Sequence, residues 1–277
     1  MICSLLSFLT NVLHVIVPEK IRFALAARLV SKYRFSYIIE DSLGVLSKRL
    51  PEDNFAFMVK TGRSCDAVEM MEQLTPSLSP GSLCFDIGAN IGITTVWMAK
   101  QAGQVYAFEP EPSNLARFRD HMRLNRVDNV ILESCAVSNH EGEATFHLTQ
   151  SYGHHSLGEV RTSPITGHIT VPLITVDNYC EKQKIERISF MKIDVEGFEL
   201  EVLQGAEQML RQQRIELVAF EVSPDILTAL SKQAAHLYDY LIESGYCVSK
   251  LNRQPVSREH FLSLRNNADF LAFPNRL

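Results

Sequence analysis

After residue 80, short apolar runs alternate with amphipathic segments of helical length, and this alternation constrains the fold more than any other feature. Each run is followed directly by an acidic residue. Continuous apolar strands that alternate with helices are typical of a parallel sheet covered on both faces. The chain has 277 residues, 46% of them hydrophobic, which is enough for such a core. The runs are residues 82–85, 105–108, 130–132, 188–193 and 215–220.

Helices are expected between these runs, from about residues 94 and 113 and over residues 200–211 and 226–244. Between the third and fourth runs, residues 169–176 alternate like a half-exposed strand. Two later runs, residues 246–251 and 269–273, are expected to close the sheet as an antiparallel pair.

Residues 1–80 have a different character, and we expect them to form a helical N-terminal extension to a domain at residues 81–277. No charged side chain precedes Glu19, and residues 20–34 then carry five Lys and Arg without an acid. The sixteen residues from Ile2 to Val17 would span about 24 Å as a helix, less than the roughly 30 Å of a bilayer core. We interpret the segment as a helix packed on the domain, with a peripheral membrane contact through residues 1–34 as the alternative.

Charge and cysteine content argue against several classes of protein. The formal net charge is −5, from 27 Lys and Arg against 32 Asp and Glu, which argues against a general nucleic-acid binder. The six cysteines form no CxxC pair and have no nearby histidine at metal-ligand spacing, so neither a zinc site nor a disulfide framework is expected. A reduced, cytoplasmic protein is the expectation, with membrane association as the alternative.

The turn after the first run carries glycines that let the backbone approach a ligand, and it reads Asp86-Ile-Gly-Ala-Asn-Ile-Gly92. A dinucleotide fingerprint starting at Gly88 would need glycine where Asn90 stands and Gly or Ala where Ile93 stands, which disfavours a nicotinamide oxidoreductase. Asp86 would repel a pyrophosphate and favours a ligand with cationic groups and no phosphate. S-adenosylmethionine, which carries a sulfonium and an ammonium group, is such a ligand.

Glu109 follows the second run, 23 residues after Asp86, where a carboxylate accepts hydrogen bonds from both hydroxyls of a ribose. The chain thus combines four motifs, at residues 86–95, 108–110, 136–138 and 191–206, the last of which reads MKIDVEGFELEVLQGA. Together they resemble the FkbM family of S-adenosylmethionine-dependent methyltransferases over about residues 83–222. The resemblance implies a Rossmann-like class I methyltransferase fold, with a mostly parallel seven-stranded sheet and helices on both faces.

The resemblance also implies which residues bind the cofactor. The methionine part would lie against Asp86, Gly88, Asn90 and Gly92, the ribose against Glu109, and the adenine against the turn from Ser134 to Ala136, with Thr94 and Asp194 completing the set. The chain departs from the pattern at Cys135, where many class I enzymes have an acid. The adenine amino group therefore needs a different partner, such as the backbone. A second departure is His121, where the family often has Asn.

Three charged residues, Lys192, Asp194 and Glu196, alternate with apolar ones at the end of the fourth run, so they are expected on one face of a strand. Burying a charged side chain costs free energy, so such a side chain is expected to be paired or to have a function. Lys192 is therefore expected either to pair with an acid or to stand beside a carboxylate that accepts a proton from the substrate. Glu221, after the fifth run, would approach the same cleft. The chain does not show the six oxygen ligands of a hard divalent cation, so we assign no metal site.

A polar loop at residues 151–158 provides a second candidate for the general base, because His154 and His155 titrate near neutral pH. Long loops over a sheet edge often act as substrate lids. Asp177 is expected to cap the short helix that follows it.

The sequence therefore predicts a methyltransferase that acts on a hydroxyl of a small-molecule or glycan acceptor. The catalytic candidates are Asp194, Glu196, Lys192, His154 and His155. Two alternatives are a nicotinamide-dependent oxidoreductase and a non-catalytic, membrane-docking adaptor that keeps the methyltransferase fold.

Overall fold

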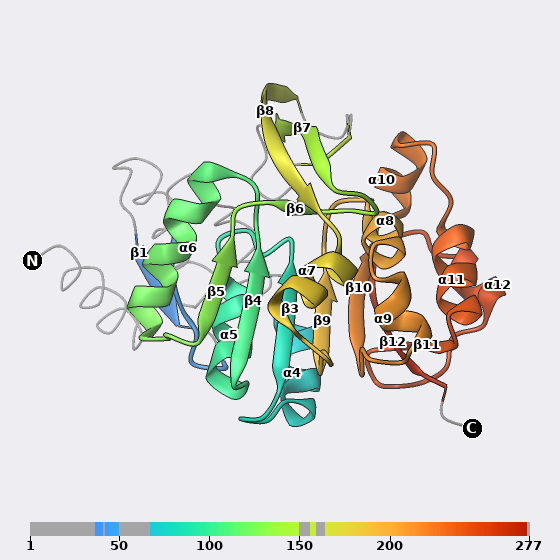
Figure 1. The fold of residues 1–277 in the computed structure, drawn as a ribbon, viewed down its shortest axis with the longest axis horizontal. Helices are drawn as coiled ribbons and strands as arrows, with labels where there is room; N and C mark the ends of the chain where they lie inside the picture. The colour runs from blue at the N-terminus through green and yellow to red at the C-terminus, as the bar shows by residue number, and fades with distance from the viewer. Residues whose placement is uncertain (1–36, 41, 50–66, 150–155, 159–163, 276–277) are drawn as a thin grey trace, which may run out of the picture.

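The computed structural model describes residues 37–40, 42–49, 67–149, 156–158 and 164–275. Its centre is a seven-stranded sheet with the strand order β11-β12-β10-β9-β3-β4-β5 (Figure 1). The five strands from β10 to β5 run parallel, whereas β12 runs antiparallel to both β10 and β11. The predicted sheet and its late antiparallel pair are confirmed. The strands are β3 (Leu83–Ile87), β4 (Gln104–Phe108), β5 (Val130–Glu133), β9 (Phe190–Ile193), β10 (Val218–Val222), β11 (Tyr246–Lys250) and β12 (Ala268–Pro274).

Helices cover both faces of this sheet, as continuous apolar strands require. In β3, Phe85 and Ile87 point into one core, whereas Cys84 points into the other. The first core is covered by α7 (Val176–Gln183), α8 (Glu199–Gln204), α9 (Glu207–Arg211), α11 (Ala234–Glu243) and α12 (Arg258–Leu262). The second is covered by α4 (Val68–Leu74) and α5 (Ile93–Gln101), with α6 (Pro112–Asn125) beside it. Trp97 of α5 meets Phe190 of β9 edge-on, with 5.9 Å between the ring centroids.

A second sheet of three strands stands over the carboxyl ends of the central strands (Figure 1). It consists of β6 (Ala136–Val137), β7 (Gly142–Thr149) and β8 (Ile165–Ile174), in the order β6-β8-β7. Phe146, Val171 and Leu173 form its own small core together with Ala136. The sequence predicted only one half-exposed strand in this region, and β8 corresponds to it.

Two helices that the sequence predicts as continuous are interrupted. Residues 200–211 form α8 and α9 with a break at Gly205 and Ala206, and residues 226–244 form α10 (Pro224–Ala229) and α11 with a break between them. At Gly205, a β-carbon would lie 2.0 Å from the carbonyl oxygen of Ser138, so only glycine allows this approach. The break therefore lets the chain just after β6 pack against the junction of α8 and α9.

Asp177 does not cap its own helix, contrary to the sequence expectation. Thr175 caps α7, because its hydroxyl accepts a hydrogen bond from the backbone N–H of Asn178. The Asp177 carboxylate instead accepts from the backbone N–H groups of Gln208 and Met209 in α9. Asp177 thus joins two helices of the same layer, a long-range role that local sequence does not reveal.

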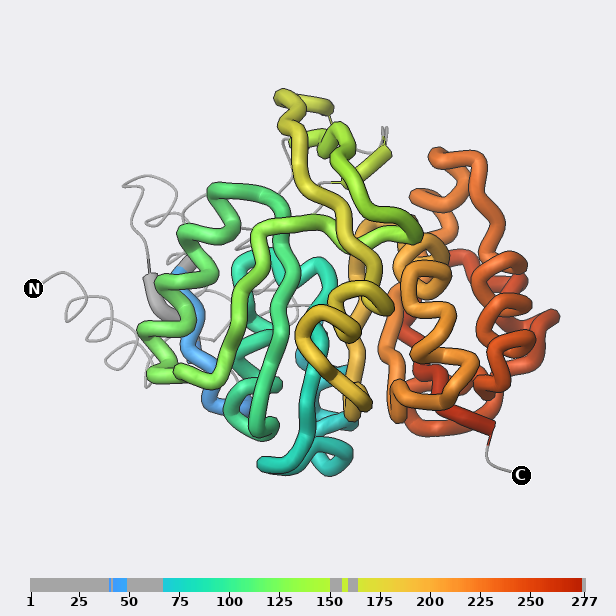
Figure 2. The backbone as a smooth tube through the Cα atoms, in the orientation of Figure 1, coloured from blue at the N-terminus to red at the C-terminus, as the bar shows by residue number. Residues whose placement is uncertain are grey.

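The described part of residues 1–80 differs from the expected helical extension. It contains a hairpin of β1 (Tyr37–Glu40) and β2 (Leu46–Arg49), then α4 and the short 3₁₀ turn η1 (Thr75–Ser77). The hairpin lies beside α6 in both backbone views (Figure 2). His121 accepts a hydrogen bond from the N–H of Lys48, and Asn125 bonds both the N–H and the carbonyl of Leu46. The domain boundary at residue 80 stays a prediction.

Residues 1–34, for which the sequence raised a membrane contact, lie outside the described residues. Among the helices that the structure describes, none has the length and apolar content needed to cross a bilayer.

We expect Gly205→Ala to destabilise the fold by about 1–3 kcal/mol, because the added methyl group would meet the rigid backbone of Ser138. Gly167→Ala is the matched control, since a β-carbon there makes only an ordinary contact, 3.9 Å from Leu148. Urea denaturation of both variants measures the difference. Equal stability of the two variants would contradict the close approach at Gly205.

Candidate functional site

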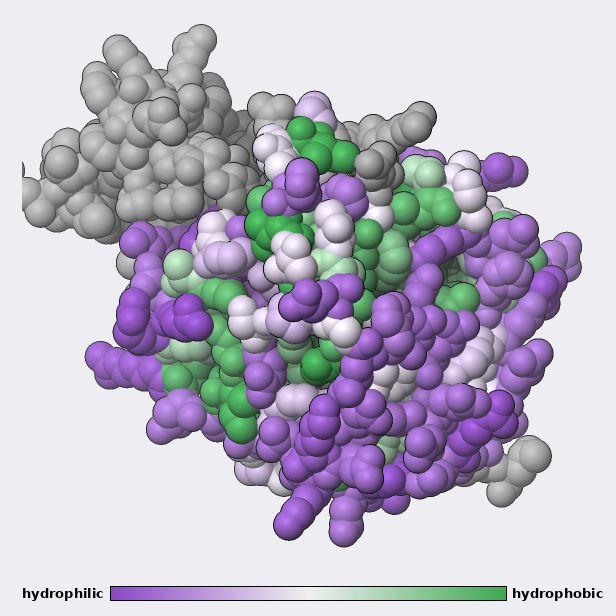
Figure 3. Space-filling view, turned by 45° about the horizontal axis from the view of Figure 1, so that its top comes forward, coloured by the Kyte–Doolittle hydropathy of each residue, from purple (hydrophilic) through white to green (hydrophobic). Residues whose placement is uncertain are grey.

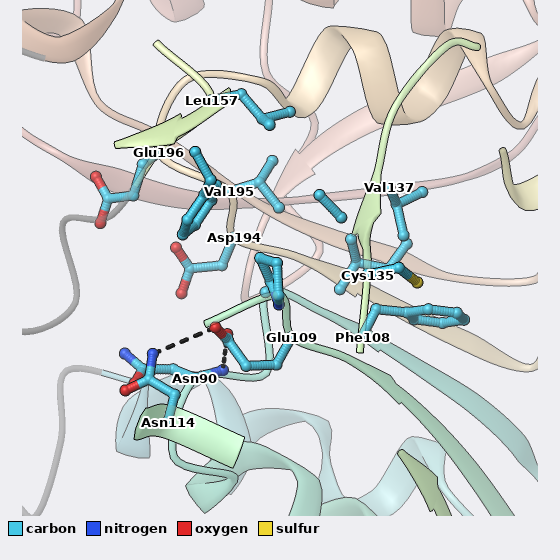
Figure 4. A pocket seen from close by; sticks show the side chains of 15 residues that line it. Asn90, Phe108, Glu109, Asn114, Cys135, Val137, Leu157, Asp194, Val195 and Glu196 are labelled. Carbon is cyan, nitrogen blue, oxygen red and sulfur yellow. Dashed lines mark hydrogen bonds between the residues drawn. The ribbon is translucent and has the colours of Figure 1, made fainter. Parts of the chain in front are cut away.

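An open pocket lies at the carboxyl ends of β3, β4 and β9, beneath the three-stranded sheet (Figure 4). Ligands of open α/β sheets bind at this edge, where the strand order reverses. The space-filling view turned toward this end shows apolar patches at the top, centre and left of the molecule, whereas its lower right is mostly hydrophilic (Figure 3). One wall of the pocket comes from the turn after β3 and from Glu109, and another from the turn after β9.

The turn after β3 needs glycine at Gly88 for two reasons. Its φ is +79°, and a β-carbon there would lie 1.9 Å from the carbonyl oxygen of Asp194. Asn90 also adopts a left-handed conformation, with φ of +50°. The turn after β3 is therefore packed directly against the turn that follows β9.

Glu109 is 5% exposed, and its carboxylate is held by three donors. The backbone N–H of Asn90 donates to Oε2 at 2.8 Å, and the N–H of Glu111 donates to Oε1 at 2.9 Å. The Asn114 side chain adds a contact at 3.3 Å (Figure 4). Burial raises the pKa of Glu109 to about 7, although these hydrogen bonds act in the opposite direction. The carboxylate is thus fixed in the pocket wall before any ligand arrives.

Asp86 does not line the pocket, although the sequence placed it against the cofactor. It is fully buried on the side of the sheet that faces α5, and its Oδ2 accepts hydrogen bonds from the hydroxyls of Thr94 and Thr95. The ammonium of Lys192 lies 3.7 Å from its Oδ1. Asp86 therefore acts behind the pocket wall, as an anion beside Lys192.

Lys192 is also buried, and it joins two acids. Its Nζ lies 3.0 Å from Oδ2 of Asp194, whose side chain is 41% exposed and lines the pocket. Burial opposes the charge on Lys192, but Asp194 and Asp86 outweigh it and raise the pKa of the ammonium. Lys192 therefore stays protonated and orients the Asp194 carboxylate, as one of the two sequence interpretations expected.

The turn after β9 carries Glu196 into the pocket wall. Glu199, at the start of α8, folds back beneath this turn and accepts hydrogen bonds from the N–H groups of Val195 and Gly197. From the other side, the hydroxyl of Ser156 donates to the carbonyl of Glu196. Sequence reasoning did not assign Glu199 a role, because nothing in a strand or helix pattern indicates that a helical acid turns back toward the preceding strand.

Glu221 is the penultimate residue of β10, and its pKa is raised to about 8 by burial and by the nearby acids Asp194, Glu196, Asp269 and Glu199. The side chain of Asn267 donates a hydrogen bond to it.

Within the described residues, no group of three or more His, Cys, Asp or Glu side chains has the arrangement of a metal site.

Six of the residues that the sequence assigned to the site line the pocket together: Gly88, Asn90, Glu109, Ala136, Asp194 and Glu196. Four others lie outside its wall: Asp86 and Lys192 are buried behind it, Thr94 bonds to Asp86, and Gly92 begins α5. Ser134 is exposed and does not line the pocket. His154 and His155 lie outside the described residues.

The apolar wall of the pocket was not predicted. Val137 and Phe146 come from the three-stranded sheet, and Leu157 comes from the segment between β7 and β8. They reach the pocket only because the small sheet folds over the large one.

Cys135 also lines the pocket. Burial and the nearby Glu133 raise the pKa of its thiol to about 12, so the thiol is neutral and does not act as a nucleophile.

Comparison with known proteins agrees with this geometry. Residues 86–248 match the family model for the methyltransferase FkbM domain. The 2-O-methyltransferase NoeI of Sinorhizobium fredii is 27% identical over 195 residues, which cover 64% of this chain and 78% of that protein. The hexuronic acid methyltransferase AglP of Haloferax volcanii is 25% identical over 171 residues, which cover 60% of this chain and 68% of that protein.

A third relative, the 31-O-demethyl-FK506 methyltransferase FkbM of Streptomyces tacrolimicus, is 30% identical over 160 residues, which cover 47% of this chain and 61% of that protein. Among solved structures, a methyltransferase FkbM from Methylobacillus flagellatus aligns with a TM-score of 0.46 at 15% identity, covering 79% of this chain and 60% of that one.

The family match spans more than half of the chain and includes both turns of the pocket. The nicotinamide oxidoreductase alternative is therefore wrong. This chain belongs to the FkbM family of S-adenosylmethionine-dependent methyltransferases.

Proposed function

We propose that this chain transfers the methyl group of S-adenosylmethionine to a hydroxyl oxygen of a sugar-like or other small acceptor. The observation that carries the proposal is the shared pocket, in which Glu109 lines one wall and the acidic turn at Asp194 and Glu196 lines another. The relatives NoeI and AglP, which are named as a 2-O-methyltransferase and a hexuronic acid methyltransferase, support a sugar-like acceptor.

The pocket residues fit this cofactor. The Glu109 carboxylate is fixed by two backbone donors, and it can accept hydrogen bonds from two ribose hydroxyls once these replace the 3.3 Å contact with Asn114. Gly88 leaves the turn without a side chain where the methionine part would lie, and Ala136 and Val137 give the adenine an apolar surface. When bound, S-adenosylmethionine supplies a methyl group that its sulfonium makes electrophilic.

The acidic turn would bind and deprotonate the acceptor. A hydroxyl loses its proton as it gains a methyl group, so a base must stand within about 3 Å of its oxygen. We assign this role to Asp194, which lines the pocket on the side of β9 and is oriented by Lys192. Glu196 would accept a hydrogen bond from a further hydroxyl of the acceptor. Lys192, held as a cation by two acids, orients the base and does not take the proton.

Two parts of the sequence interpretation stay proposals. His154 and His155 are the rival bases, and they come shortly before Leu157 of the pocket wall in the sequence. The non-catalytic adaptor does not agree with the family match, but a peripheral membrane contact through residues 1–34 stays a proposal. A truncation that abolishes vesicle binding without reducing turnover would separate docking from catalysis.

We expect Glu109→Ala to weaken S-adenosylmethionine binding by about 1.5–3 kcal/mol, the range for hydrogen bonds to a charged group. Glu133→Ala is the matched control, because Glu133 ends the neighbouring strand and bonds to Tyr179 outside the pocket wall. Calorimetry on both variants measures the affinities. Unchanged affinity of Glu109→Ala would remove this residue from the cofactor site.

Cofactor affinity is expected to depend on the titration of Glu109. Its pKa of about 7 in the free protein is raised by burial, and the ionised form is the better acceptor for ribose hydroxyls. Affinity should therefore rise as the pH increases through 7 and level off above about 8. Dissociation constants between pH 6 and 8.5 measure this, and Glu109→Gln should lose the dependence. An identical pH profile in both proteins would assign the titration to another group.

Asp194→Asn is expected to lower kcat by about 10²–10⁴-fold while cofactor affinity changes little, because the amide keeps the shape of the side chain but cannot take a proton. Turnover is measured with methyl glycosides of a neutral hexose, a 6-deoxyhexose and a hexuronic acid. His154→Ala and His155→Ala serve as the comparison and should stay near wild type. Loss of turnover in a histidine variant, with activity retained in Asp194→Asn, would assign the base to the loop.

A further inference from the structure

The turn between β9 and α8 has a backbone conformation that must be held in place. Glu196 has a φ of +55° and Gly197 a φ of +91°, so two consecutive residues are left-handed. A side-chain-bearing residue in this region costs about 1–2 kcal/mol and persists only when its surroundings fix it. Gly197 has no room for a side chain either, because a β-carbon would lie 2.7 Å from Leu230 and 2.8 Å from Ile226.

The inner side of this turn is held by one carboxylate. Oε1 of Glu199 accepts hydrogen bonds from the N–H of Val195 at 3.2 Å and from the N–H of Gly197 at 3.1 Å. Glu199 is 3% exposed and does not line the pocket, so it cannot touch the acceptor. Its two bonds flank Glu196, the residue with the strained conformation.

The outer side of the turn is held by groups from other elements. Nζ of Lys232 donates to the carbonyl of Gly197 at 2.9 Å and pairs with Glu201 at 2.6 Å. The hydroxyl of Ser156 donates to the carbonyl of Glu196 at 3.1 Å. These contacts fix carbonyl groups only. The N–H groups of Val195 and Gly197 depend on Glu199, and a buried donor without a partner costs about 1–3 kcal/mol.

We propose that Glu199 is a positioning residue, whose buried carboxylate holds the 194–197 turn in the conformation that presents Asp194 and Glu196 to the acceptor. The proposal rests on the role given above to these two acids. It assigns Glu199 a task that differs from an ordinary helix cap, because its side chain also reaches back to two N–H groups of the preceding turn.

The titration of Glu199 provides a signature for this role. Burial raises its pKa to about 7, and the hydrogen bonds from the turn oppose that effect. The charged groups on the surrounding elements are Asp194, Glu196, Glu221 and Lys232, the last paired with Glu201. Protonation weakens the carboxylate as an acceptor, so the turn should loosen as the pH falls below 7.

The first arm of the test follows the backbone amides of Val195 and Gly197 by NMR, in the full chain with S-adenosylhomocysteine as the probe. In the wild type, both amide protons should shift upfield together as the pH falls, with one midpoint near 7. In Glu199→Gln, which keeps an oxygen acceptor but does not titrate, this transition should be absent. Amides that follow another midpoint, or the same transition in Glu199→Gln, would overturn the proposal.

The second arm separates positioning from stability. Glu199→Ala should lower kcat about tenfold or more, while the dissociation constant for S-adenosylhomocysteine stays within about threefold. Glu199→Gln should restore most of kcat at pH 7.5 and lose the pH dependence near 7. Glu207→Ala, at the exposed start of α9, is the matched control and should leave kcat unchanged.

Wild-type kcat in Glu199→Ala, or a kcat as low in Glu199→Gln as in Glu199→Ala, would overturn the proposal. If Glu199→Ala does not fold, the amide titration of Glu199→Gln still decides. If no glycoside is methylated by the wild type but the amides titrate as expected, the proposed acceptor class fails while the role of Glu199 in holding the turn stands.

Discussion

The site depends on a close approach between two turns that lie more than 100 residues apart in sequence. A β-carbon at Gly88 would lie 1.9 Å from the carbonyl oxygen of Asp194, so nothing larger than glycine separates the turn after β3 from the turn after β9. The two strands are neighbours in the parallel sheet, and the N–H of Asp194 donates to the carbonyl of Ile87 at 3.0 Å. The contact brings the glycine-containing turn after β3 and the acidic turn after β9 into one pocket.

Buried charge reinforces this arrangement from behind. Lys192 lies between Asp86 and Asp194, on the face of the sheet that α5 covers, and the hydroxyls of Thr94 and Thr95 stabilise Asp86. A buried charge is tolerated only when it is paired, so removal of either acid would leave Lys192 short of a counter-charge. Asp86 thus balances the charge on Lys192 from behind the pocket. Lys192 in turn orients the Asp194 carboxylate in the pocket.

Sequence patterns predicted the large sheet well, because its strands are covered on both faces and read as continuous apolar runs, as residues 105–108 do. They also predicted that Glu109 lies at the edge of the sheet that holds the pocket, since the position after the second strand of such a sheet is fixed by topology. They did not indicate that the side chain of Asp86 points to the α5 face, because which helix covers which face is a property of the whole fold. The roles of Gly205 and Asp177 were missed for a related reason. Each depends on an element distant in sequence, Ser138 for the former and α9 for the latter.

The central claim is that Glu109 and Asp194 serve one reaction from opposing parts of a single pocket. A crystal structure of the full chain with S-adenosylhomocysteine tests it most directly. The account predicts that both ribose hydroxyls donate to Glu109, that the backbone turn at Gly88 and Asn90 borders the amino-acid part, and that the thioether sulfur faces the Asp194 carboxylate. A nucleoside bound away from Glu109, or a sulfur directed away from the turn after β9, would contradict it.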